Sequence, residues 1–381
     1  MGPLDSIRTD VIGSLLRPDY LKEAYRQHAA GQLDADGLRA VQDRAVREAI
    51  ALQEAVGLDV ITDGEQRRLN FQDVFSNSVV GYAQGRTDIA FHEQRVAGAQ
   101  PLRRFDFAPD EEPGPAVVQR RPVVERLRLV RNTPLEEYRF ASAVATRPVK
   151  VTFIGPERIG QRWDRAGSAP VYADLRAFLA DVVAIEREIV RGLVDAGCRY
   201  VHIDAPGYTA YVDAPSLAQM RARGEDPADN LAASLAADNA LIADFPGVTF
   251  GIHLCRGNQR SMWHREGSYD AIAEQLFNTL QHQRFLLEYD SDRAGGFEPL
   301  RFVPKGKVVV LGLISTKVPE TPSVDALCRR IDEAARYLSL EQLAISTQCG
   351  FASDVVGNLI TPDDQRRKLE RVVEVARRVW G

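Results

Sequence analysis

The chain carries VTFGIHLC at residues 248–255 and RFLLEYD at residues 284–290, two short apolar runs that flank a segment of helical spacing at 268–282. Apolar runs of this length are typical of parallel strands that are buried on both faces. A helix between two such strands is the usual crossover connection. The segment therefore predicts a strand–helix–strand unit.

The same alternation extends outward in both directions. Further strand candidates lie at residues 9–14, 58–65, 149–155, 199–205, 307–313 and 343–350. Predicted helices span residues 34–56, 172–196, 214–242, 323–338 and 362–379. Eight strand–helix units predict a (β/α)8 TIM barrel, with residues 1–381 as one domain. Two medium domains also fit the length, and an open doubly wound sheet is the alternative fold, but it lacks a Gly-rich dinucleotide turn.

One segment breaks the alternation. Residues 84–147 are rich in arginine, proline and acidic residues and contain short β-like pieces. We interpret them as an insertion after the second strand, folded as a small hairpin lobe that covers the barrel mouth. A solvated excursion of the chain is the alternative.

Composition excludes several classes of protein. The chain has 381 residues, 45% of them hydrophobic, and a formal net charge of -5. A nucleic-acid-binding protein normally has a basic face, which this charge balance does not indicate. The chain has no apolar run of about 18 residues, so we expect no membrane span, and it begins without an apolar signal core. We expect a cytoplasmic protein.

Polar or reactive residues stand at the ends of most predicted strands. In a (β/α)8 barrel the active site lies at the C-terminal ends of the strands. The strand-end residues are Gly13, Ser14, Asp63, Glu65, Asp204, His253, Cys255, Glu288, Ser315, Thr316, Lys317, Gln348 and Cys349. We expect these groups to surround one mouth of the barrel.

His253 and Cys255 form the sharpest local pattern. Residues i and i+2 of a strand point to the same side, so both side chains face the barrel axis. Cysteine and histidine are preferred zinc ligands. Alone, a His-x-Cys pair is more often structural than metal-binding, but Glu288 and Cys349 end two further strands of the same barrel. The placement favours a metal site on these four residues.

The remaining cysteines and one histidine have plainer interpretations. Cys198 precedes a strand at the end away from the active site, and Cys328 lies within a predicted helix. Four cysteines in a chain of this length do not indicate a disulfide scaffold. His202 shares a strand face with Asp204, and we interpret it as a core histidine with satisfied hydrogen bonds.

Several long segments resemble the cobalamin-independent methionine synthase family, in its short single-barrel form. They are VIGSLLRPDYLKEA (11–24), VGLDVITDGEQRR (56–68), HLCRGNQRSMWHREGSYDAIAEQLFN (253–278), FLLEYDSDRAGGFEPLRFVPKGKVVVLGLISTKVPE (285–320), LAISTQCGFAS (343–353) and GNLITPDDQRRKLERVVEVA (357–376). The resemblance covers nearly the whole chain except much of residues 84–147. It implies a (β/α)8 barrel with a catalytic zinc.

The resemblance also implies roles for individual residues. The zinc ligands of the family correspond to His253, Cys255, Glu288 and Cys349. Its contacts with an amino-acid thiol correspond to Ile12, Gly13, Ser14, Glu65 and Asp204. Zinc would favour the thiolate form of the substrate, because a free thiol is mostly protonated at neutral pH.

The chain departs from the family where the methyl donor is handled. The family has a histidine after the seventh strand, whereas this chain has Ser315, Thr316 and Lys317, so we assign no catalytic acid. A tryptophan near Gly155 stacks on folate in the family, and Trp163 lies close to that place. Trp163 is therefore a candidate donor contact.

Three functions remain open. The first is S-methylation of a thiol, homocysteine above all, as in the 5-methyltetrahydropteroyltriglutamate–homocysteine methyltransferases of methionine biosynthesis. The donor would be methyltetrahydrofolate, methylcobalamin on a corrinoid protein, or a small methylated compound. The second is alkylation of a thiol by an epoxide, as in zinc-dependent epoxyalkane:coenzyme M transferases. The third is a non-catalytic zinc-binding barrel.

Overall fold

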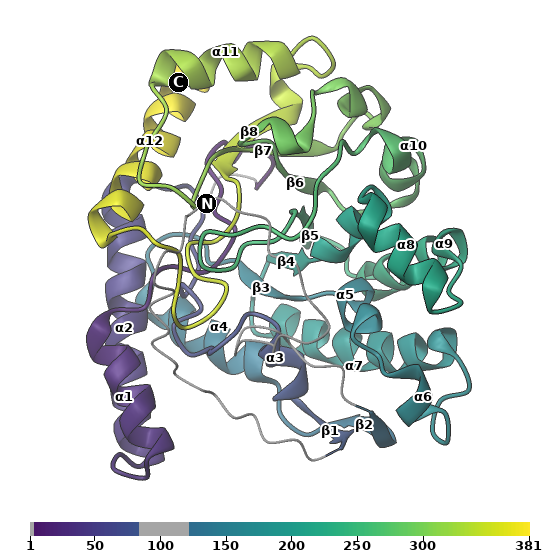
Figure 1. Cartoon of the computed structure of the whole chain (residues 1–381). Helices are drawn as coiled ribbons and strands as arrows, with labels where there is room; N and C mark the ends of the chain where they lie inside the picture. The colour runs from purple at the N-terminus through teal and green to yellow at the C-terminus, as the bar shows by residue number, and fades with distance from the viewer. Residues whose placement is uncertain (1–3, 84–121) are drawn as a thin grey trace.

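The computed structural model describes residues 4–83 and 122–381, and at its centre lies a parallel sheet (Figure 1). Six neighbouring strands make up this sheet in sequence order. They are β3 (Val151–Ile154), β4 (Tyr200–Asp204), β5 (Thr249–Leu254), β6 (Arg284–Glu288), β7 (Val308–Ile314) and β8 (Leu343–Thr347). The register of β4 and β5 sets Asp204 directly beside His253. The sheet thus aligns predicted site residues before any side chain is considered.

Two further segments continue the sheet at its edges. Thr9 forms a parallel bridge with Ile345 of β8, and Ile61 forms one with Val149 before β3. The two segments also meet each other, because the backbone N–H of Leu15 donates to the carbonyl of Gly64 at 3.0 Å. These bonds link the two segments to the two edges of the sheet and to each other, which agrees with the predicted barrel. The predicted strands 9–14 and 58–65 are nevertheless reduced to single bridges, because side chains make much of the contact between them.

Helices surround the sheet, as Figure 1 shows. They are α1 (Asp19–Ala29), α2 (Ala35–Val56), α3 (Asp73–Ser76), α4 (Thr133–Val144), α5 (Pro156–Gln161), α6 (Arg165–Ser168), α7 (Leu175–Asp195), α8 (Ala214–Ala222), α9 (Pro227–Ile242), α10 (Asp270–Thr279), α11 (Val324–Ala334) and α12 (Pro362–Trp380). The bounds of α2 follow from its sequence. Asp34 accepts from the backbone N–H of Gly37, and Gly57 ends the helix in the left-handed region.

The single helix expected at residues 214–242 is two helices, α8 and α9. Gly224 takes a positive φ of 72° directly after α8. Asp226 then caps α9, with Pro227 in its first turn. These are a helix stop signal and a helix start signal in succession, and they outweigh the continuous alanine-rich pattern.

Part of the predicted insertion at residues 84–147 lies outside the described residues. On its two flanks, β1 (Val79–Tyr82) and β2 (Val123–Leu129) pair as an antiparallel ribbon. Residues 133–144 form α4, which packs against α2 and α7 as one of the outer helices. The antiparallel ribbon accordingly begins before residue 84, and the chain has returned to the barrel before residue 147.

The core has an outer and an inner part. The outer part lies between the helices and the outward faces of the strands. The inner part is a small apolar cluster of Ile12, Cys255, Leu286, Val310, Ala344 and Cys349. Two of the predicted zinc ligands thus belong to the lining of the barrel interior. Among residues 4–83 and 122–381, no helix is long and apolar enough to cross a membrane.

Candidate metal and thiol site

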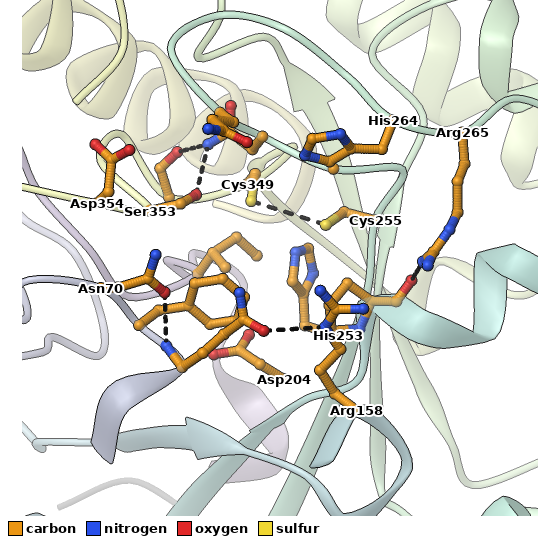
Figure 2. Close-up of a pocket in the computed structure, with 18 of the residues that line it drawn as sticks. Asn70, Arg158, Asp204, His253, Cys255, His264, Arg265, Cys349, Ser353 and Asp354 are labelled. Carbon is orange, nitrogen blue, oxygen red and sulfur yellow. Dashed lines mark hydrogen bonds between the residues drawn. The ribbon is translucent and has the colours of Figure 1, made fainter. Parts of the chain in front are cut away.

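Three of the four predicted metal ligands lie together at the C-terminal end of the barrel. The ligand atoms of His253, Cys255 and Cys349 all lie within 4.8 Å of one another, and all three residues are buried. His253 lies in β5 and Cys255 directly follows it, while Cys349 follows β8. Figure 2 shows the two sulfur atoms facing each other above the imidazole of His253. Barrel closure therefore brings together residues that are 94 positions apart.

The distance between the sulfur atoms fits a shared metal. The Sγ atoms of Cys255 and Cys349 are 4.0 Å apart. A disulfide needs about 2.05 Å. Two sulfurs at about 2.3 Å from one tetrahedral zinc would lie about 3.8 Å apart. The pKa of Cys255 is lowered well below its usual value, first because the Cys349 thiol donates to its sulfur and then by the charge of His253. Cys255 is thus the readier thiolate of the pair.

The imidazole of His253 presents one nitrogen towards the sulfur of Cys255. Nδ1 lies 3.1 Å from the carbonyl oxygen of Leu286, which can only accept, so Nδ1 carries the proton. Nε2 is buried and has no hydrogen-bond partner in the described part of the chain. A buried nitrogen without a partner is costly unless a ligand uses its lone pair. The second nitrogen of a metal-bound histidine commonly donates in this way to a carbonyl.

Glu288, the fourth predicted ligand, is not part of this close group. Its Oε2 accepts from the backbone N–H of Arg256 at 2.5 Å, and its Oε1 pairs with Arg293 at 3.3 Å. Burial acts to raise the pKa of Glu288, but Lys317, Arg256 and Arg293 outweigh it and lower the pKa. Glu288 is therefore a carboxylate whose charge acts on Cys255. Its two oxygens already have partners in Arg256 and Arg293.

The predicted thiol-binding residues border the same space. A cavity of about 450 Å³ is lined by Ile12, Ser14, Glu65 and Asp204 together with His253, Cys255 and Cys349. Gly13 does not line it but supports its wall. A Cβ at Gly13 would lie 2.5 Å from Oε1 of Glu65, so only glycine allows that carboxyl group its position.

Glu65 and Asp204 together favour a positively charged ligand. Glu65 has a φ of 54°, an uncommon conformation for a residue with a side chain, which aims it into the cavity. Its Oε1 accepts from Thr152 at 2.8 Å, but no described residue is a hydrogen-bond partner of Oε2. Burial raises the pKa of Glu65, and it raises the pKa of Asp204 to about 6. An ammonium group between them would hold both as carboxylates.

A column of polar residues continues below Asp204 into the barrel. Nε2 of His202 lies 3.1 Å from Oδ1 of Asp204, and Nδ1 lies 3.0 Å from Nζ of Lys150. Lys150 donates in turn to Asp10 at 2.6 Å. A protonated Lys150 makes Nδ1 the acceptor, so Nε2 carries the proton and donates to Asp204. His202 is thus a satisfied core histidine, as expected, and it orients Asp204.

The residues predicted near the methyl donor do not line the thiol cavity. Ser315 and Lys317 do not line the 450 Å³ cavity. Lys317 is fully buried, and its Nζ has no hydrogen-bond partner among the described residues. Trp163 stacks on Phe178 with ring centroids 5.7 Å apart and lines a second cavity instead. The remaining cysteines, Cys198 and Cys328, are outside the metal group.

Some residues of the site escaped the sequence analysis. Arg158 of α5 and Arg265, in the loop after β5, both border the cavity. Asn258 of that loop donates to the carbonyl of Gly350 at 2.7 Å and so ties the β5 loop to the β8 loop. The only available signal was the high arginine content, because no short motif distinguishes a cavity arginine from a surface one.

Comparison with known proteins places the chain in a family. Residues 116–378 match the family model of the cobalamin-independent synthase catalytic domain. The chain is 34% identical to the uncharacterised protein YxjH of Bacillus subtilis, over 98% of this chain and 94% of that protein. It is 24% identical to a protein named methionine synthase in Pyrococcus abyssi, over 91% of this chain and 87% of that protein.

A solved structure agrees at the level of the fold. The B12-independent methionine synthase of Shewanella sp. W3-18-1, in complex with selenomethionine, has a TM-score of 0.70 and 17% identity. The comparison covers 98% of this chain and 97% of that one. The family match supports a methyltransferase of the homocysteine type, and it gives a corrinoid partner no support. The chain belongs to the cobalamin-independent methionine synthase family.

Proposed function

We propose that this protein is a zinc-dependent S-methyltransferase that methylates homocysteine to methionine. The observation that carries the proposal is one cavity lined both by the His253, Cys255 and Cys349 group and by the carboxyl pair of Glu65 and Asp204. The first group suits a metal that activates a thiol. The second suits the ammonium group of an amino acid.

The donor atoms suit zinc in particular. One imidazole nitrogen and two thiolate sulfurs are ligands that zinc prefers, whereas magnesium and calcium take oxygen. The free Nε2 of His253 and the 4.0 Å separation of the sulfurs fit such an ion. Bound zinc would supply one property, a preference for the thiolate form of a thiol at neutral pH. Glu288 is the proposed fourth ligand, and it would have to leave the backbone N–H of Arg256 to serve.

The protein's own groups supply the recognition of the amino acid. Glu65 and Asp204 bind the substrate ammonium, and His202 holds Asp204 as an acceptor. Ile12 and Ser14 border the cavity beside them, where they contact the rest of the amino acid. Such positioning converts the encounter of two substrates into a step within one complex. The selenomethionine in the Shewanella structure supports an amino acid of this type.

Coenzyme M fits the cavity less well than homocysteine does. The sulfonate of coenzyme M would face the two carboxyl groups, and like charges in a buried site repel strongly. A non-catalytic barrel would not need an open cavity beside its metal. Methyltetrahydrofolate is the first methyl donor to test, followed by small methylated compounds.

X-ray absorption on the zinc-loaded protein tests this function. We expect homocysteine to add one sulfur neighbour to the zinc, and coenzyme M at the same concentration to add none. A methyl-transfer assay with methyltetrahydrofolate should then yield methionine. Unchanged sulfur coordination with homocysteine would contradict the assignment of the thiol.

A further inference from the structure

The carboxyl group of Glu65 is held on one side only. Its Oε1 accepts a hydrogen bond from the hydroxyl of Thr152 in β3 at 2.8 Å. Its Oε2 is buried, and no described residue is a hydrogen-bond partner of this oxygen. Glu65 borders the cavity of about 450 Å³, whereas Thr152 does not. One carboxylate oxygen is therefore fixed from behind, and the other remains for a ligand in the cavity.

Arg68 determines the direction in which the Thr152 hydroxyl donates. Nη1 of Arg68 donates to Oγ1 of Thr152 at 3.3 Å, and Nη2 donates to the backbone carbonyl of the same threonine at 2.7 Å. A guanidinium group can only donate, so the threonine oxygen accepts on this side and its single proton is left for Glu65. Nη1 also lies 3.6 Å from Oε1 of Glu65. Arg68 thus acts on the carboxylate by its charge and also through Thr152.

Glu137 of α4 holds Arg68 in this position. Its Oε2 accepts from Nη2 of Arg68 at 2.7 Å, and both of its oxygens lie 3.2 Å from Nε. The row of side chains thus runs from an outer helix to the wall of the cavity. All four of its residues are between 2% and 5% exposed. Charges that are shielded from water in this way are screened little by salt.

The backbone around Glu65 favours the same contact. Glu65 has a φ of 54°, which lies in the left-handed region that a residue with a side chain seldom adopts. A Cβ at Gly13 would lie 2.5 Å from Oε1 of Glu65 and 3.0 Å from Cγ2 of Thr152. Three segments of the chain therefore meet at this one oxygen. An ion pair between Arg68 and Glu137 that served only the core would need neither feature.

We propose that Thr152, Arg68 and Glu137 are positioning residues that fix Glu65 for the amino group of the thiol substrate, an inference that rests on the function proposed above. None of the three lines the cavity, so they act through Glu65. Burial raises the pKa of Glu65, and the charge of Arg68 opposes that effect. A carboxylate that is fixed in advance costs less to order when an ammonium group binds. The preference for amino-acid thiols is thus set partly by residues that do not touch the substrate.

Binding of two thiols tests the positioning role without any reaction. The probes are homocysteine and γ-mercaptobutyrate, which is homocysteine without its amino group, titrated by calorimetry into the zinc-loaded protein. Thr152→Val removes the hydroxyl and should weaken homocysteine binding about 10-fold, as for one lost hydrogen bond to a charged group. Binding of γ-mercaptobutyrate and the zinc content should not change. Thr152→Ser keeps the hydroxyl and should restore the preference for homocysteine. Thr249→Val, at the start of β5, is the matched control and should change neither affinity by more than about twofold.

The ion pair behind Thr152 provides a second arm. Glu137→Gln keeps the shape of the side chain but removes the charge that holds Arg68. We expect the ratio of the two thiol affinities to fall in the same direction as in Thr152→Val. Because this variant breaks a buried ion pair and costs stability, the Thr152 variants, which leave that pair intact, decide the outcome if it does not fold.

The outcomes separate the positioning role from the proposed function. An equal loss of affinity for both thiols in Thr152→Val, or no loss for homocysteine, would overturn the positioning role. If homocysteine affinity falls as expected but the wild-type protein forms no methionine from any methyl donor, the positioning role stands and the proposed methyl transfer fails. If methionine forms and Thr152→Val keeps the wild-type KM for homocysteine, methyl transfer stands and the positioning role fails.

Discussion

The polar column inside the barrel differs between its floor and its mouth. At the floor, Oδ1 of Asp10 accepts from Lys150 at 2.6 Å, and Oδ2 accepts from Tyr200 at 2.7 Å. Both nitrogens of His202 also have partners. At the mouth, Nε2 of His253 and Oε2 of Glu65 are equally buried, but no partner for either exists among the described residues.

This difference separates structural from ligand-binding polar groups. An unpaired buried polar atom costs about 1–3 kcal/mol, so a folded protein normally pairs it. At the floor, Asp10, Lys150 and His202 are paired with other side chains. The mouth leaves a nitrogen lone pair of His253 for a metal ion and a carboxylate oxygen of Glu65 for an ammonium group. The floor should therefore control stability, and the mouth should control binding.

The largest effect should come from the sulfur atoms at the mouth. Cys255→Ser and Cys349→Ser each replace a thiolate by a neutral hydroxyl, which is a poor zinc ligand. We expect the zinc content to fall from about one per chain to nearly none and methyl transfer to be lost. Metal analysis after dialysis measures this. Cys328→Ser, on the outer helix α11, should keep its zinc. Full retention of zinc in either mouth variant would remove that cysteine from the ligand set.

At the floor, Lys150→Met should act on stability instead. It removes the ammonium partner of Asp10 and leaves Arg284, at 3.4 Å, as its one remaining buried cation in the described part of the chain. Breaking a buried ion pair typically costs about 3–5 kcal/mol, so we expect a loss towards the lower end of that range. Urea unfolding should show this loss in the free energy of unfolding, with the zinc content intact. Lys305→Met, at an exposed lysine, should change the free energy of unfolding by less than about 0.5 kcal/mol. A loss below about 1 kcal/mol for Lys150→Met would mean that the floor does not depend on this pair.

The smallest effect concerns Gly13, which lies against Glu65 and Thr152 and does not line the cavity itself. In Gly13→Ala the new Cβ would meet Oε1 of Glu65 at 2.5 Å and displace that carboxyl group. We expect the KM for homocysteine to rise about 10-fold, as for one lost charged hydrogen bond. The KM for a thiol without an amino group should not change, and zinc should remain bound. An equal rise for both thiols would show that the alanine disturbs the cavity rather than ammonium binding.

Much of the fold followed from local patterns in the chain. Strands buried on both faces must be apolar, so β3 to β8 were visible as short runs. The helix bounds of α2 followed from Asp34 and Gly57. The two strands expected at residues 9–14 and 58–65 were only partly correct, since each makes one bridge to the sheet. Side-chain contacts such as that of Asp59 with the backbone of Thr9 replace the ladder there, and periodicity does not reveal them.

The sequence by itself determined that His253 and Cys255 share one side of a strand, because alternation along a strand is a local property. Only the tertiary structure decided that Cys349 lies 4.0 Å from Cys255, that Glu288 turns to Arg256, and that Lys150 reaches His202. It also decided that Arg158 and Arg265 meet at Gln161. All but the contact of Arg158 with Gln161 join residues at least 32 positions apart in the chain. They depend on closure of the barrel and on the rotamers that close packing permits, which no local pattern encodes.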